Sequence, residues 1–162
     1  CSTGAYPFEF RRKVFETIGM AKCPRGGDEA RGFGFLRAGD SITMNRDRLI
    51  ADAKQVALDL VAEGYRQYRP RTDVPALGEP ALAAFKLGVY QMEQGGYISE
   101  HDAKIAVKLA KIITGGDLAH RSTVTEQQLL DLEREAFLSL CGERKTLERI
   151  QHTLKTGKPL RN

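Results

Sequence analysis

The 162-residue sequence lacks the marks of several protein classes. Its three cysteines are far apart and odd in number, so they form neither a disulfide framework nor a paired zinc motif. This pattern favours a reducing compartment, and we expect a cytoplasmic protein. No apolar run approaches the roughly 18 residues that a membrane helix needs, so we expect no membrane span.

Common catalytic motifs are also missing. The three histidines share no helix face and lie in no H-E-x-x-H pattern, and no G-x-S-x-G nucleophile motif occurs. The paired glycines lack the G-x-G-x-x-G spacing of a dinucleotide site, so we interpret them as turns and helix ends. Asp131, Glu133 and Glu135 are interpreted as a solvated helix face, because charged side chains are usually exposed. We therefore predict no catalytic residue, metal ligand or bound cofactor in this chain.

The composition is that of an ordinary globular protein. The hydrophobic fraction is 41% and the charged fraction 28%, and 25 basic against 21 acidic residues give a net charge of +4. This charge allows an anionic partner. The two signs are interspersed, however, so the composition does not indicate nucleic acid as that partner.

Apolar periodicity and capping residues predict an all-α fold of six or seven helices within residues 7–157. Asn45 is a suitable N-cap for the helix expected over 46–63, and Thr125 with Gln128 forms a capping box before the helix over 125–141. Ser99-Glu-His-Asp102 is similar to a capping box, although Glu or Gln is preferred at the position of Asp102. We expect Phe137 to face the core and Arg11, Arg12 and Lys13 to face water. We expect no strand. The predicted helices are 7–20, 28–33, 46–63, 80–94, 99–114, 125–141 and 143–156.

The segment 65–78 is predicted to be an extended connector. It contains Pro70 and Pro75 among polar residues, which disfavours a helix. We therefore place a boundary there, between a part comprising 1–66 and a part comprising 67–162.

Basic residues are concentrated at the C-terminal end. Residues 143–162 hold six basic and two acidic side chains, a sum of +4 that equals the charge of the whole chain. Lysine and arginine bind phosphate well. A solvated basic helix end is the alternative, because cations near a helix C-terminus are favourable in any case. The six are Arg144, Lys145, Arg149, Lys155, Lys158 and Arg161.

Several motifs carry a resemblance that covers nearly the whole chain, and the most specific of them is Leu154-Lys-Thr-Gly-Lys-Pro-Leu-Arg-Asn162. The sequence resembles the C-terminal end of bacterial fatty-acid oxidation fusion proteins. In these, a 3-hydroxyacyl-CoA dehydrogenase precedes an enoyl-CoA hydratase of the crotonase superfamily. The other motifs are Phe15-Glu-Thr-Ile-Gly-Met-Ala-Lys22, Glu29-Ala-Arg-Gly-Phe-Gly-Phe-Leu36, Met44-Asn-Arg-Asp-Arg-Leu49, Gly96-Tyr-Ile-Ser-Glu-His-Asp102, Leu132-Glu-Arg-Glu-Ala-Phe-Leu138 and Gly142-Glu-Arg-Lys-Thr146.

The resemblance implies that this chain contains two parts of a longer protein. Residues 1–66 would be the helical end of the hydratase domain and 67–162 a helical extension, and the start at Cys1 is interpreted as that of a fragment. No catalytic residue of the family maps onto this chain, so we expect the fragment alone to be inactive. The parent would use NAD and a coenzyme A thioester. The partners would be the missing dehydrogenase and hydratase core, in a homo-oligomer.

The resemblance also gives the basic end a candidate role, with Lys155, Lys158 and Arg161 contacting coenzyme A phosphates. The fragment would then support acyl-CoA binding and subunit packing. We expect exposed apolar surface where the core is missing, above all on the first helix, with Phe8, Phe10, Phe15 and Ile18. A stand-alone helical interaction module without a catalytic role is the second interpretation.

Overall fold

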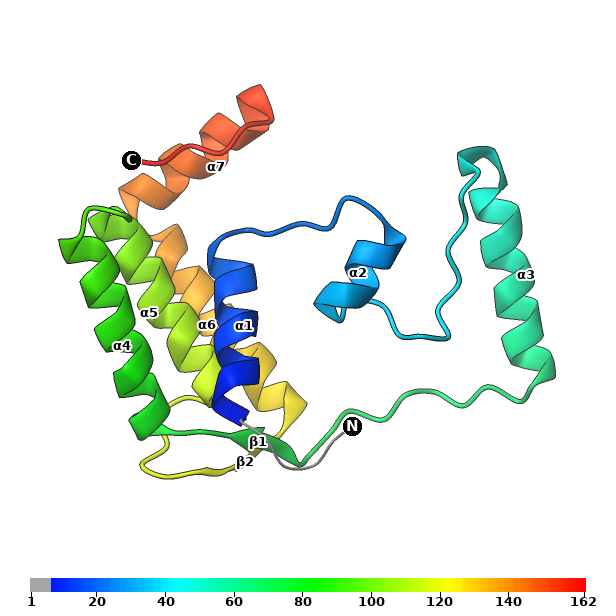
Figure 1. The fold of residues 1–162 in the computed structure, drawn as a ribbon, viewed down its shortest axis with the longest axis horizontal. Helices are drawn as coiled ribbons and strands as arrows, with labels where there is room; N and C mark the ends of the chain where they lie inside the picture. The colour runs from blue at the N-terminus through cyan, green and yellow to red at the C-terminus, as the bar shows by residue number, and fades with distance from the viewer. Residues whose placement is uncertain (1–6) are drawn as a thin grey trace. The chain divides into compact units, whose positions relative to one another are not determined.

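The computed structural model describes residues 7–162 and is predominantly helical (Figure 1). The predicted all-α class is confirmed. The capping residues Asn45, Ser99 and Thr125 each accept a backbone N–H bond at a helix start, as their positions predict. The helices are α1 (Pro7–Gly19), α2 (Gly27–Phe33), α3 (Leu49–Ala62), α4 (Glu79–Gln94), α5 (Glu100–Thr114), α6 (Glu126–Cys141) and α7 (Arg144–Thr156), with a 3₁₀ turn η1 (Arg46–Arg48) before α3.

A small sheet forms where no strand was expected. Strands β1 (Val74–Ala76) and β2 (Ser122–Val124) pair antiparallel, with Val74 opposite Val124. The prediction of no strand is wrong at these positions. Three residues are too few to show alternation in the sequence, and their pairing depends on a partner strand far along the chain.

The described chain divides into two units. One contains α1 together with the chain from Pro70 onward, and the other contains residues 22–69. The division at Arg69 and Pro70 falls within the segment 65–78, and α1 groups with the later helices rather than with α2 and α3. The assignment of 1–66 and 67–162 to parts of a longer protein stays a prediction.

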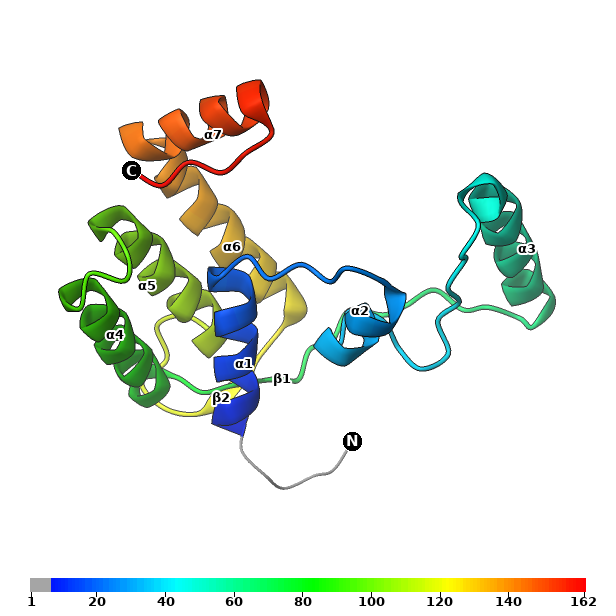
Figure 2. The ribbon, with the colours of Figure 1, turned by 45° about the horizontal axis from the view of Figure 1, so that its top comes forward.

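The core of the first unit lies between α1, α4 and α5, which Figures 1 and 2 show side by side. The ring of Phe85 is buried, with ring centroids of Phe8 and Phe15 at 5.2 and 4.9 Å. The expectation that these two α1 residues stay exposed is therefore wrong, because α4 and α5 supply their partner. Phe10 and Ile18 are exposed, as expected.

The C-terminal end of α5 is held by residues from two distant segments. Arg11 was grouped by sequence with solvent-facing residues, but its guanidinium is half-buried and donates to the carbonyls of Ile113 and Pro75. The carbonyl of Thr114 accepts the N–H groups of Leu77 and Gly78 at 3.1 and 3.0 Å. Because the last helical carbonyls have no partner within the helix, these donors stabilise the end of α5.

Helix α3 in the second unit differs from the helices of the first. It carries apolar residues at helical spacing, yet none of its residues is buried in the described structure. Ile50 and Val61 are 84% and 73% exposed. The sequence correctly predicts the helix, while its apolar face, which would normally pack on a core, is not covered by the rest of its own unit, residues 22–69.

Candidate functional site

The basic C-terminal segment, residues 143–162, consists of α7 and a short tail that we define as residues 157–162. Gly157 ends α7 in the left-handed region, at φ +67°, and its N–H donates to the Thr153 carbonyl at 2.8 Å. Glycine adopts this conformation without steric cost. The tail then runs back along α7, as Figure 2 shows in red.

Arg149 joins three parts of this region. Its Nη1 donates to the Asp102 carboxylate at 2.7 Å, and its Nε donates to the Asn162 side-chain oxygen at 2.8 Å. Its Nη2 lies 3.2 Å from the backbone oxygen of Asn162 and 3.4 Å from the Ser99 hydroxyl. The Arg149 and Asp102 side chains are only 18% and 22% exposed, so water competes little with this ion pair.

Asn162 uses both ends of its amide. While its oxygen accepts from Arg149, its Nδ2 donates to the Glu148 carboxylate at 2.8 Å and lies 3.5 Å from the Lys145 carbonyl. We call Ser99, Asp102, Glu148, Arg149 and Asn162 the tail-anchoring cluster. Through this cluster, the end of the tail is bonded both to α7 and to the first turn of α5.

The α5 side of the cluster is itself a capping box. Ser99 accepts from the Asp102 N–H at 3.1 Å, and the Asp102 carboxylate accepts from the Ser99 N–H at 3.1 Å. Burial acts to raise the pKa of Asp102, but the hydrogen bonds from Arg149 and Ser99 outweigh it and leave the pKa below its usual value. The carboxylate is therefore charged at neutral pH, as the pair with Arg149 requires.

Two further contacts join α5 to α7. His101 is buried, with its Nε2 at 2.9 Å from the Thr146 hydroxyl, and Lys104 pairs with Glu143 at 2.8 Å. Burial lowers the pKa of His101, and the nearby charge of Arg149 lowers it further. The imidazole is thus neutral at pH 7, and it acts as a packed hydrogen-bonding group rather than as an exposed charge.

The three candidate phosphate ligands all belong to this segment. Lys155 lies in the last turn of α7, Lys158 follows the Gly157 turn, and Arg161 precedes the anchored Asn162. All three side chains are exposed, and none forms an ion pair with a carboxylate of residues 7–162. The cluster therefore fixes the backbone beside these cations while leaving their charges free for an anion.

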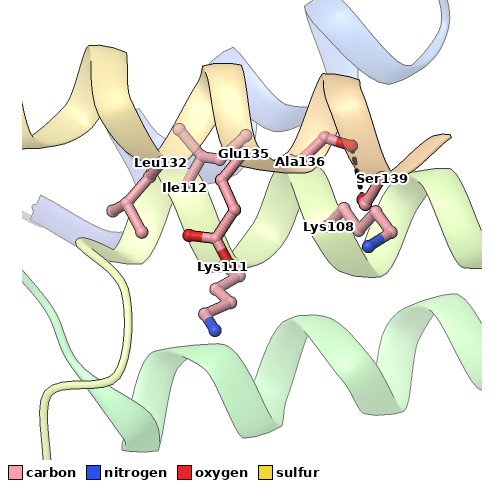
Figure 3. A pocket seen from close by; sticks show the side chains of 7 residues that line it. All are labelled: Lys108, Lys111, Ile112, Leu132, Glu135, Ala136 and Ser139. Atoms are coloured by element: carbon pink, nitrogen blue, oxygen red, sulfur yellow. Dashed lines mark hydrogen bonds between the residues drawn. The ribbon is translucent and has the colours of Figure 1, made fainter. Parts of the chain in front are cut away.

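Two surface hollows in the first unit offer weaker sites. The smaller lies between α5 and α6 and measures about 100 Å³, below the roughly 300 Å³ at which small-molecule pockets begin. Figure 3 shows its lining, in which the Ser139 hydroxyl bonds the Ala136 carbonyl. The lining residues are Lys108, Lys111, Ile112, Leu132, Glu135, Ala136 and Ser139.

The larger hollow, of about 590 Å³, lies along α4 and α5. Its three lysines are balanced by three glutamates, so it has no net attraction for an anion. No group of three or more His, Cys, Asp or Glu side chains within residues 7–162 could hold a metal ion. The carboxylates at 131, 133 and 135 are exposed, in agreement with their interpretation as a solvated face.

Some contacts and exposures of these helices were not predicted from the sequence. The capping box at Ser99 was visible as a local motif, but Arg149 and Asn162 lie 47 and 60 positions beyond Asp102, and no local pattern connects them. Phe137 was assigned to the core and is exposed instead. The α6 residues at 129, 132, 136 and 140 are half-buried, so the packed stripe lies on a different side of the helix from Phe137.

Comparison with known proteins identifies a bacterial relative. The chain is 49% identical over 160 residues, 98% of its length, to a probable 3-hydroxyacyl-CoA dehydrogenase of Bacillus subtilis (strain 168). It spans 20% of the length of that protein. No family model and no solved structure matches the chain. The chain is thus homologous to a small part of a protein named as a dehydrogenase, which supports the dehydrogenase part of the resemblance.

No helix in the part of the chain that the structure describes combines the length and the hydropathy that crossing a membrane requires.

Proposed function

We propose that this chain is a helical part of a fatty-acid β-oxidation enzyme that contains a 3-hydroxyacyl-CoA dehydrogenase. The observation that carries the proposal is the 49% identity, over 98% of the chain, to the Bacillus subtilis protein. We further propose that the parent contains a crotonase-type enoyl-CoA hydratase, because the motifs from 132 to 162 resemble the end of such fusion proteins. NAD and the acyl-CoA substrate would act in the parent.

The chain itself would bind and pack rather than catalyse. Within residues 7–162, most acidic side chains are exposed, several of the half-buried ones pair with lysine or arginine, and no group of metal-ligating side chains exists. Acid–base catalysis needs groups that converge on a substrate in a site that excludes water. We therefore expect the purified 162-residue chain to show no dehydrogenase or hydratase turnover above a buffer control.

The proposed ligand of the basic segment is the nucleotide end of coenzyme A. This end carries a 3′-phosphate and a diphosphate, which exposed lysine and arginine side chains can contact with charge-assisted hydrogen bonds. Lys155, Lys158 and Arg161 are exposed and have no acidic partner in the described chain. Their availability supports the proposal, whereas a paired or buried set would oppose it.

The proposed packing surface is α3. Its exposed apolar face would be covered by the rest of the parent protein or by another subunit of a homo-oligomer. Large apolar side chains such as Ile50 and Val61 seldom line up on a free surface unless they mark an interface.

The test of the phosphate role is Lys155→Ala combined with Lys158→Ala in the full-length protein. A well-formed charge-assisted contact is worth about 1.5–3 kcal/mol, so KM for an acyl-CoA should rise by roughly one to two decades while kcat changes little. Lys13→Ala with Lys22→Ala is the control, because it removes the same charge from exposed positions away from α3 and α7. An unchanged KM in the Lys155 and Lys158 variant, with the fold preserved, contradicts the phosphate role.

The stand-alone interaction module is the second candidate, and the exposed face of α3 is the observation that favours it. The two candidates differ in the gene that encodes the chain. A reading frame containing a dinucleotide-binding fingerprint upstream of Cys1 supports the β-oxidation enzyme, and a start codon directly before Cys1 supports the module.

A further inference from the structure

The side-chain hydrogen bonds between the tail and the rest of the first unit are made by the final residue, while the Leu160 side chain is half-buried. Within residues 7–162, Asn162 is the tail residue whose side chain bonds to other segments, with contacts to Lys145, Glu148 and Arg149. Lys158 contributes only backbone contacts, to the hydroxyls of Thr153 and Thr156. The conformation of the tail beyond Gly157 therefore depends on what holds Asn162.

Arg149 is the central group of that attachment. It donates to two oxygens of Asn162 and, on its other side, to the Asp102 carboxylate at the start of α5. A planar guanidinium with five N–H donors can serve these acceptors at once, whereas a lysine ammonium on a flexible stem cannot match the same fork. The pair with Asp102 also fixes the rotamer of Arg149, so the groups that face Asn162 are held in place.

We propose that Arg149 is a positioning residue that orders the tail, through Asp102 and Asn162, so that Lys158 and Arg161 are presented to the phosphates of an acyl-CoA. The inference rests on the proposed function for its ligand, but the ordering of the tail is measurable without any ligand. A segment that is ordered before binding loses less conformational freedom on binding, which raises affinity. Arg149 itself is partly buried and occupied by three partners, so it does not contact the phosphates.

The hydrogen bonds of the neutral Asn162 amide support this role. Its Nδ2 lies 2.8 Å from a Glu148 oxygen and its Oδ1 lies 2.8 Å from Arg149 Nε, so the amide matches an acceptor and a donor at once. Aspartate has the same shape but would place a carboxylate against Glu148. The structure therefore favours asparagine over its isosteric acid at this position.

The experiment is hydrogen exchange of the full-length protein, read for peptides covering the tail and, separately, α4 to α6. Arg149→Met, Arg149→Lys, Asn162→Ala and Asn162→Asp should each raise exchange about tenfold or more at the N–H groups of Gly157 and Lys158, which are bonded to the Thr153 carbonyl and the Thr156 hydroxyl, since local opening governs exchange. Peptides from α4 to α6 should be unchanged. The control is Arg134→Met, which removes an exposed helical arginine paired with Asp131 at 3.6 Å.

If loss of Arg149 unfolds α7, the variant Asn162→Ala still tests the ordering of the tail. It removes the Asn162 side chain that contacts Arg149 and leaves α7 unchanged. Unchanged tail exchange in Asn162→Ala and in folded Arg149→Met overturns the ordering role. The same variants are assayed for acyl-CoA affinity, where we expect KM to rise about tenfold with kcat nearly constant.

The affinity assay separates this inference from the proposed function. If Lys155→Ala with Lys158→Ala raises KM but a loosened tail does not, the positioning role is wrong while the phosphate role stands. If neither raises KM while Arg149→Met and Asn162→Ala still loosen the tail, the phosphate role is wrong and the ordering of the tail by Arg149 is supported.

Discussion

Helices α3 and α5 are alike in length and in having an apolar stripe, yet they differ in what covers that stripe. Residues of α5 such as Ala110 and Ile113 are buried by contacts with α1, α4 and α6, whereas α3 has no buried residue. Helical periodicity thus predicts that a face is apolar, but the partner of the face depends on distant parts of the chain. The four predictions below test this difference.

The largest effect is expected in the core beside α5. Phe85→Ala should lower the free energy of unfolding by about 3–5 kcal/mol, because it removes a buried ring that contacts Phe8 and Phe15. Urea denaturation of the 162-residue chain measures it. Ile50→Ala in α3 is the matched comparison and should change stability by less than about 0.5 kcal/mol, because the side chain is exposed. Equal losses in the two variants would show that α3 is packed in solution.

A smaller loss is expected from Gly115→Ala at the end of α5. Gly115 has a φ of +97°, and a Cβ there would lie 2.5 Å from the Ala76 Cβ. The conformation alone costs about 1–2 kcal/mol for a non-glycine residue, and the contact with β1 should add to it. Gly96→Ala, after α4, has φ +72° and open space, so it measures the conformational cost alone. If both substitutions cost the same, the approach of β1 to α5 is looser than the structure indicates.

Acid should weaken the junction of α5 and α7. The pKa of buried His101 is lowered, so below the usual value of 6.5 the unfolded chain binds a proton that the folded chain does not. The free energy of unfolding should therefore fall as pH drops from about 6.5, by at most about 1.4 kcal/mol per pH unit from this group. The groups facing His101 are Arg149, Lys145, Lys104 and Glu143.

Urea denaturation at pH 7.5 and at pH 5.5 measures this change in the free energy of unfolding. The variant His101→Gln should show a weaker dependence of that free energy on pH. A pH dependence that survives in His101→Gln would mean that another group is responsible.

The smallest effect on stability, but a clear one on association, is expected from Ile50→Asp with Val61→Asp in α3. The 162-residue chain should self-associate through its exposed apolar residues, and this variant should shift it toward monomer in sedimentation experiments. Phe10→Asp on α1 tests the other exposed candidate, which the sequence analysis favoured. A chain that is monomeric at high concentration before any substitution would contradict the association.

Much of the local structure was predictable from the sequence. Asn45, Ser99 and Thr125 cap helices where their motifs predict, because an N-cap bond forms within four residues. The candidate cations at 155, 158 and 161 were also visible as a local concentration of charge. Their exposure is now known, while their contact with coenzyme A stays a prediction.

Predictions from the sequence are wrong where the partner of a residue lies far along the chain. Arg11 looked like a surface cation and donates to carbonyls of α5 and β1 instead. Phe8 and Phe15 looked like an uncovered patch and pack on Phe85. The arginine side chain has an apolar stem and a charged head, so it can lie either in water or against a packed surface. The position of Arg11 in the sequence therefore does not decide between these two environments.

By itself, the sequence determined which segments are helical and which residues cap several of them, because capping and periodicity act within a few residues. Only the tertiary structure decided that α1 packs with the later helices, that β1 pairs with β2, and that Arg149 joins Asp102 to Asn162. Each of these contacts closes a long loop, and its free energy depends on groups that no local pattern links.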